Sequence, residues 1–105
     1  MASYRSLVRC KFKQGMKDKG LEYFEKEIIS KGRDAGCHDI EILLEENNPY
    51  QVIVIGLWDN ITSVKNFEST WNHKMPELLR LCTDTPTKET FILHRTYDAR
   101  ARHVA

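Results

Sequence analysis

Apolar and polar residues alternate along two short segments of the chain, 7–13 and 38–45. One face of the first segment holds Val8, Cys10 and Phe12, and one face of the second holds Ile40, Ile42 and Leu44. Successive side chains of a β-strand point to opposite faces, so this period of two predicts two strands. Residues 50–58 and 89–97 are rich in β-branched and aromatic side chains and predict two more. Asn48 and Pro49 favour a hairpin between the second and third strands.

The run from Val52 to Trp58 differs from the other predicted strands because nearly every side chain in it is apolar. A strand with one face in water would alternate, so this strand should be covered on both faces. Two helices in a chain of 105 residues can cover only one face of a small sheet. A second copy of the chain is the simplest cover for the other face, and we therefore expect a homodimer.

Two segments have helical spacing. Leu21, Phe24 and Ile28 predict a helix over 16–31 that ends near Gly32 or Gly36. A second helix is predicted from its apolar stripe, formed by Val64, Phe67, Trp71 and Met75. Pro76 is predicted to open a further helical segment after a break, since proline favours the first helical turn.

The predicted order is β-α-β-β-α-β, which is the ferredoxin-like α+β pattern. It places a four-stranded antiparallel sheet under two helices and leaves no room for another domain, so residues 1–105 form one domain with a core over 7–97 and a basic tail over 98–105. Charged residues are expected on the outer face of the sheet, namely Arg9, Lys11, Asp39 and Glu41. A dimer interface there would be partly polar, and the alternation does not settle which face of the third strand meets the partner.

Composition narrows the range of partners. Sixteen basic and fifteen acidic residues give a net charge of +1, which argues against binding to nucleic acid or to an anionic membrane surface. Cys10, Cys37 and Cys82 are too scattered for a disulfide framework or a metal motif, and reduced thiols in a cytoplasmic protein are the expectation. Neither a signal peptide nor a membrane-spanning run is expected.

Between residues 7 and 97 the chain resembles the antibiotic biosynthesis monooxygenase-like family of dimeric α/β barrels. The resemblance depends on four features: Gly15 after the first strand, the turn at 35–37, the 48–49 hairpin and the junction at 57–60 followed by Ser63 and Val64. It implies the same fold and a homodimer. It also implies a cofactor-independent oxygenase activity on a small aromatic phenol or quinol held between sheet and helices.

The resemblance implies a mechanism in which a base removes a proton and the substrate itself reduces dioxygen, with no cofactor. His73 is the first choice of base, because a break before Pro76 could place it at a cavity mouth. The substrate-binding candidates are Trp58, Phe67, Trp71, His94 and Cys10. Each also has a structural interpretation: core packing for the tryptophans and Cys10, and exposed surface for the histidines.

Two alternatives to an enzyme stay open: a barrel that binds a small apolar molecule without turnover, and a structural dimer whose interior is filled. An aromatic-lined cavity of about 300 Å³ or more would favour a ligand, and a filled interior would argue against both enzyme and binder. The family that the chain resembles also has a haem-degrading branch, which uses an Asn on the first strand and a Trp and a His on the second helix. Haem degradation is not expected here, because the first strand lacks Asn, and Trp71 and His73, two residues apart on a helix, point about 200° apart. A metal site is not expected either, because no two histidines have ligand spacing.

Overall fold

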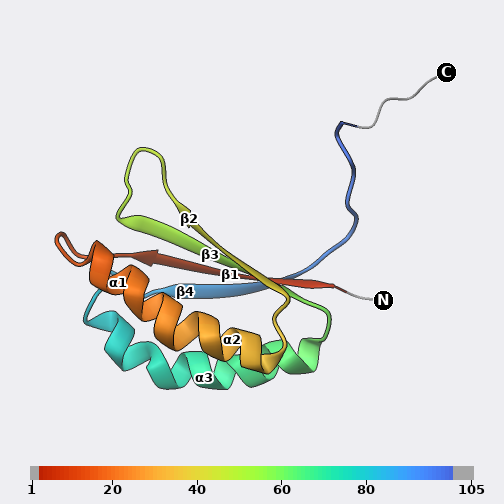
Figure 1. The fold of residues 1–105 in the computed structure, drawn as a ribbon, viewed down its shortest axis with the longest axis horizontal. Helices are drawn as coiled ribbons and strands as arrows, with labels where there is room; N and C mark the ends of the chain where they lie inside the picture. The colour runs from red at the N-terminus through yellow and green to blue at the C-terminus, as the bar shows by residue number, and fades with distance from the viewer. Residues whose placement is uncertain (1–2, 101–105) are drawn as a thin grey trace.

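The computed structural model of the chain describes residues 3–100, which form one antiparallel sheet with helices on one face (Figure 1). The strands are β1 (Tyr4–Lys11), β2 (Asp39–Leu44), β3 (Gln51–Trp58) and β4 (Thr87–Ile92). They lie in the order β2-β3-β1-β4, with every neighbouring pair antiparallel. The prediction of a ferredoxin-like α+β fold is confirmed. The part of the tail from residue 101 on lies outside the described residues.

The first helical region is formed by α1 (Lys17–Tyr23), η1 (Phe24–Ile29) and α2 (Ser30–Ala35), which follow one another without interruption. Its central part, η1, has π-helical hydrogen bonding. The region ends at Gly36, whose φ of 106° is the left-handed conformation that glycine adopts most readily. The other helix is α3 (Ile61–Leu79), which begins at Asn60, where the side-chain oxygen accepts hydrogen bonds from the backbone N–H groups of Thr62 and Ser63.

Strand β3 separates the two faces of the sheet. Its alternate residues Val52, Val54 and Trp58 point toward the helices and are buried. The residues between them, including Ile53, Ile55 and Leu57, lie on the outer face and remain only partly buried in the single chain. The strand is therefore apolar on both faces, and only one face is covered by this chain.

Three predicted boundaries are wrong. The first strand runs from Tyr4 to Lys11 rather than over 7–13, since its pairing with β3 begins at Tyr4, opposite Trp58. The expected break before Pro76 is absent, because α3 continues through the proline to Leu79. The last strand ends at Ile92 rather than at 97, because its partner β1 begins at Tyr4, which lies opposite Ile92. Beyond that pair the ladder has one more backbone hydrogen bond, from Leu93 N–H to the Ser3 carbonyl.

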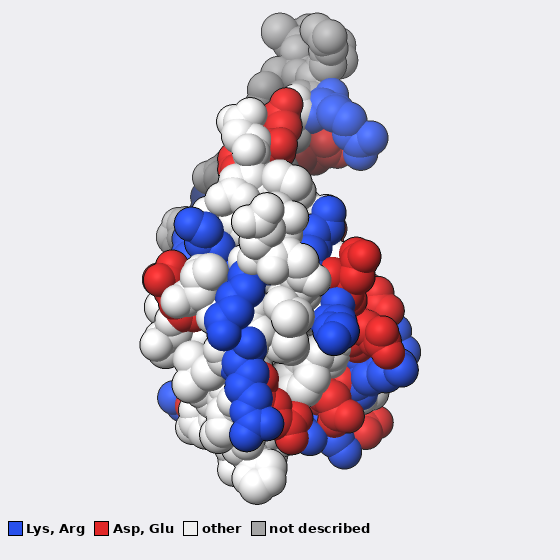
Figure 2. Space-filling model, turned by 90° about the vertical axis from the view of Figure 1, so that its left-hand side faces the viewer, with Lys and Arg blue, Asp and Glu red and all other residues white. Residues whose placement is uncertain are grey.

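The surface carries charges of both signs. On the face that Figure 2 shows, basic and acidic side chains are interspersed around uncharged surface, in keeping with the near balance of the sequence. No helix within residues 3–100 combines the length and the apolar character that crossing a membrane requires.

Candidate functional site

The space between the sheet and the helices, where the resemblance places a substrate, is almost completely filled. Its remaining cavity has a volume of about 20 Å³. A water molecule needs about 10–15 Å³ by the same measure, so the cavity cannot hold an aromatic ring. A ligand would need a cavity of about 300 Å³ or more. The filled interior therefore argues against an enzyme or a binding protein whose ligand lies between the sheet and the helices.

Trp58 is the largest fully buried side chain in that space. Its side chain is 1% exposed, and its ring centroid lies 5.4 Å from that of Phe67 on α3. The indole Nε1–H donates a hydrogen bond of 2.9 Å to Ser6 Oγ on β1. Gly56 provides the room, since a Cβ there would lie 2.9 Å from the indole nitrogen and 2.6 Å from Ser6 Oγ. A buried polar ring atom thus has its partner within the chain.

The structure brings only part of the predicted site together. Trp58 and Phe67 pack against each other, and Trp71 is buried on the same helix as Phe67. His73 is exposed, two residues after the buried Trp71, so its ring points away from the interior. His94 is exposed beyond the end of β4, and Cys10 is buried on the inner face of β1.

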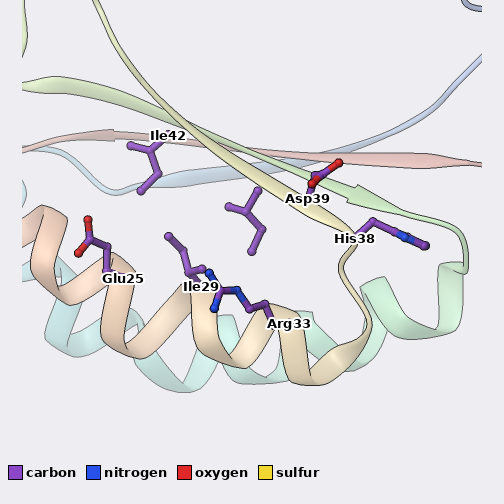
Figure 3. Close-up of a pocket in the computed structure, with 7 residues that line it drawn as sticks. Glu25, Ile29, Arg33, His38, Asp39 and Ile42 are labelled. Atoms are coloured by element: carbon purple, nitrogen blue, oxygen red, sulfur yellow. The ribbon is translucent and has the colours of Figure 1, made fainter.

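A larger open groove lies between the first helical region and the edge strand β2 (Figure 3). Its volume is about 610 Å³, and its lining residues are Glu25, Ile29, Arg33, His38, Asp39, Ile40 and Ile42. Figure 3 shows Ile42 pointing toward the helix, Ile29 pointing toward the strand, and Arg33 extending along the helix toward Ile29. The groove therefore combines three isoleucines with one cation, Arg33, and two carboxylates, Glu25 and Asp39. It has no aromatic lining, unlike the cavity expected from the sequence.

A hydrogen bond between His38 and Asp59 lies at one end of this groove, and the sequence did not predict it. His38 Nε2 bonds to a carboxylate oxygen of Asp59, and both side chains are about half-exposed. A carboxylate accepts hydrogen bonds, so Nε2 is the nitrogen that carries the hydrogen in this pair. Nδ1 is then the ring nitrogen that could accept a proton from another molecule. The ring points away from the middle of the groove in Figure 3, so the pair could act only on a molecule at that end.

No group of three or more His, Cys, Asp and Glu side chains with the geometry to hold a metal ion occurs within the described part of the chain. The candidate chemistry of the groove therefore depends on Arg33, on His38 with Asp59, and on the three isoleucines.

Comparison with solved structures gives matches to the fold over nearly the whole chain. A conserved protein from Methanosarcina mazei is 15% identical, with a TM-score of 0.74 over 87% of this chain and 92% of its own. A putative antibiotic biosynthesis monooxygenase from Nitrosomonas europaea is 11% identical, with a TM-score of 0.71 over 90% of this chain and 91% of its own. Another protein so named, from Chloroflexus aurantiacus, is 13% identical, with a TM-score of 0.69 over 91% of this chain and 97% of its own.

No protein-family model matches the sequence, and no curated protein matches it either. The similarity is therefore one of fold. It confirms the resemblance in fold to antibiotic biosynthesis monooxygenase-like structures, and at these identities it assigns no reaction to this chain.

Proposed function

We propose that this chain functions as a homodimeric structural barrel, in which two copies pack their outer sheet faces together and each interior is filled by its own side chains. The observation that carries the proposal is the apolar outer face. The partly buried residues Leu7, Ile53, Ile55 and Leu57 form its centre. Leu43 on β2 and Phe91 on β4 extend it and are 45% and 46% exposed. A contiguous apolar patch of this kind is typical of a protein interface.

The charges on the same face are compatible with a two-fold interface. Arg9 and Lys11 lie on β1, whereas Asp39 and Glu41 lie on β2, on the opposite side of β3. In a two-fold dimer every contact occurs twice, so basic residues of one copy can meet acidic residues of the other at both ends. Arg9 also forms an ion pair of 3.5 Å with Glu89 of its own chain. Exposed charge pairs between the copies would affect the orientation of the partner more than the affinity.

The test places a carboxylate at the centre of the apolar face. Sedimentation of the unchanged protein at micromolar concentration should give about twice the chain mass. Ile55→Asp buries two unpaired carboxylates per dimer, each costing at least about 1.4 kcal/mol, and should raise the dimer Kd about 100-fold or more. Ile61→Asp is the matched control, because Ile61 is exposed on α3 and away from the sheet.

Circular dichroism must show that both variants keep the fold. A monomeric parent protein would refute the proposed dimer. Equal dissociation of the Ile55 and Ile61 variants would instead place the interface elsewhere than on the outer face.

A second candidate function is favoured by the groove beside β2: cofactor-independent oxidation of a small phenol or quinol. The isoleucines offer an apolar surface for a ring, and the Arg33 guanidinium, which extends toward Ile29, could hold an oxygen of the substrate other than the one at the His38 end. Nδ1 of His38 would remove the phenolic proton, with Asp59 holding the ring orientation and stabilising the imidazolium. The substrate anion would then transfer one electron to dioxygen, and the two radicals would combine. Non-catalytic binding of the same small molecule would use the same groove.

Oxygen uptake separates these possibilities. The assay uses a panel of hydroquinones and anthrones with the parent protein, His38→Ala and His73→Ala, which was the base expected from the sequence. Arg80→Gln is the control for Arg33→Gln, since Arg80 is exposed and is not among the residues of the groove. Calorimetry with the same compounds detects binding without turnover.

Loss of uptake in the His38 and Arg33 variants would support the groove as the site, and loss only in the His73 variant would shift the site to α3. The absence of uptake with every compound would exclude the oxygenase, and the absence of both uptake and binding would leave the structural barrel.

A further inference from the structure

Two of the three cysteines lie in contact within the core. Cys10 is on the inner face of β1, and Cys82 is in the segment between α3 and β4. Their sulfur atoms are 2.6 Å apart, only about 0.6 Å longer than a disulfide bond. The side chains are 3% and 4% exposed.

Backbone hydrogen bonds hold these two segments together. Cys82 lies opposite Phe12 in an isolated antiparallel bridge. On either side of it, Lys13 N–H donates to the Leu81 carbonyl at 2.9 Å, and Thr83 N–H donates to the Lys11 carbonyl at 2.8 Å. Cys10, two residues before Phe12, shares its face, so the two sulfurs are diagonal neighbours on one short ladder. Their proximity is set by the backbone.

We propose that Cys10 and Cys82 are a redox-active pair that forms an intramolecular disulfide when a small hydroperoxide reaches it. The bond joins the C-terminal end of β1 to the segment leading into β4, across 72 positions of sequence. This assigns a modification site to the chain that is independent of the proposed dimer and of the groove.

The two thiols have different roles. The hydrogen bond between the two thiols lowers the pKa of Cys82, burial opposes that effect, and the charge of Lys13 lowers the pKa further. The same hydrogen bond, together with burial, raises the pKa of Cys10. The proposed order takes Cys82, the more acidic thiol, as the first to react and Cys10 as the resolving thiol; the reverse order forms the same S–S bond.

The reaction balances with the hydroperoxide as the oxidant. The Cys82 thiolate attacks the terminal peroxide oxygen, the O–O bond breaks, and the leaving oxygen takes a proton to give water or an alcohol. The sulfur of Cys10 then attacks the sulfenic sulfur of Cys82 and forms the S–S bond. The displaced hydroxide takes the thiol proton of Cys10 and leaves as water. Two electrons pass from the two thiols to the peroxide.

A depression on the surface reaches one member of the pair, Cys10, and Cys82 is not among its lining residues. The depression has a volume of about 300 Å³, with Lys11 and Asp84 among its other residues. Hydrogen peroxide is small enough to enter such a space.

Cys37 is a natural control within the chain. Its thiol donates to the backbone carbonyls of Asp39 and Leu57, at 3.2 and 3.3 Å. It is also buried, and burial raises its pKa. It is therefore a thiol of similar exposure whose hydrogen bonds go to backbone oxygens.

The test treats the full chain with hydrogen peroxide, blocks remaining thiols with N-ethylmaleimide under denaturing conditions, and maps the peptides by mass spectrometry. The expected product is a Cys10–Cys82 linked peptide pair with the mass loss of two hydrogen atoms, reversed by dithiothreitol. The oxidised protein should unfold at a temperature higher by about 8 °C or more, because the link constrains the unfolded chain. Cys37→Ser should behave like the parent protein, whereas Cys10→Ser and Cys82→Ser should lose both effects.

The peptide map of the parent protein decides the matter even where a serine variant fails to fold. Three thiols that all remain free for alkylation after oxidation would overturn the proposal. A linkage that includes Cys37 would overturn it as well.

Discussion

Truncation of Phe67 to alanine tests whether the interior is closed by its own side chains. Phe67 is 5% exposed, packs on Trp58 and lines the residual 20 Å³ cavity. Removing its ring should merge the vacated space with that cavity and create an apolar hole beside the indole. The new hole would lie where the resemblance places a substrate.

The expected cost follows from the burial of the ring. Replacing a buried Phe by Ala costs about 3–5 kcal/mol, because transfer free energy is lost and the surroundings collapse only partly. Domains of this size have free energies of unfolding of about 5–15 kcal/mol, so the variant should remain folded with a much reduced margin. At about 4 °C per kcal/mol, the thermal midpoint should fall by roughly 12–20 °C.

Urea denaturation with and without saturating benzene measures both effects. Benzene at 100 times its Kd would restore about 2.7 kcal/mol to Phe67→Ala and nothing to the parent protein. Leu79→Ala is the matched control, since Leu79 lies on the same helix and is 40% exposed. If Phe67→Ala fails to fold, Phe67→Leu should show a smaller loss in the same direction. A cost below about 1 kcal/mol, or benzene stabilisation of the parent protein, would refute the closed interior.

Three other predictions concern single hydrogen bonds and are read from denaturation curves. Ser6→Ala leaves the buried Trp58 indole N–H without an acceptor and should cost about 1–3 kcal/mol in urea; an unchanged midpoint would show that the bond contributes nothing net. Asn60→Ala removes the cap of α3 and should cost about 0.5–2 kcal/mol of stability. Asn60→Asp should keep most of the stability, because an aspartate oxygen can accept the same hydrogen bonds. The hydrogen bond from Lys88 lowers the pKa of Glu68 below its ordinary value of 4.5, so its stabilisation is present above that pH and is lost as the pH falls through the lowered pKa. Lys88→Met should therefore lose less stability than the parent protein as the pH falls through this range. An equal loss in both proteins would contradict a stabilising bond between Lys88 and Glu68.

The sheet was largely predictable because one face of each strand is set by sequence alternation. The run from Val52 to Trp58 was the exception, since its letters do not alternate. In the structure its burial alternates fully, from Val52 on the inner face to Leu57 on the outer face. The absence of a polar face in this strand thus correctly indicated an apolar face that one chain leaves uncovered.

The continuation of α3 through Pro76 was not predictable in the same way. Proline removes one helical hydrogen bond and its ring crowds the preceding turn, which favours a break in an isolated helix. Here Trp71 and Leu78, on either side of Pro76, are both buried against the core, and the helix ends three residues after the proline. Tertiary packing outweighs a local cost near the helix end.

The candidate site was the least predictable part. His38 and Asp59 are 21 positions apart, and they meet because β2 and β3 pair in the register that puts Asp39 opposite Leu57. Sequence alternation does not fix such a register. Similarly, residue types cannot give the volume that remains among Trp58, Phe67 and Gly56, which depends on contacts of a few tenths of an ångström.

Trp58 links these conclusions, because the same residue carries the family resemblance and closes the interior. Its indole N–H must be hydrogen-bonded when buried, and in a barrel with a ligand the ligand could supply the acceptor. In this chain Ser6 supplies it from the neighbouring strand. A molecule entering the interior would have to displace the ring, break that bond and replace the packing on Phe67. An apolar compound offers no acceptor for the indole, and a phenol would have to lose its own hydration to provide one. This is why we assign the chain's interactions to the outer sheet face and to the groove beside β2.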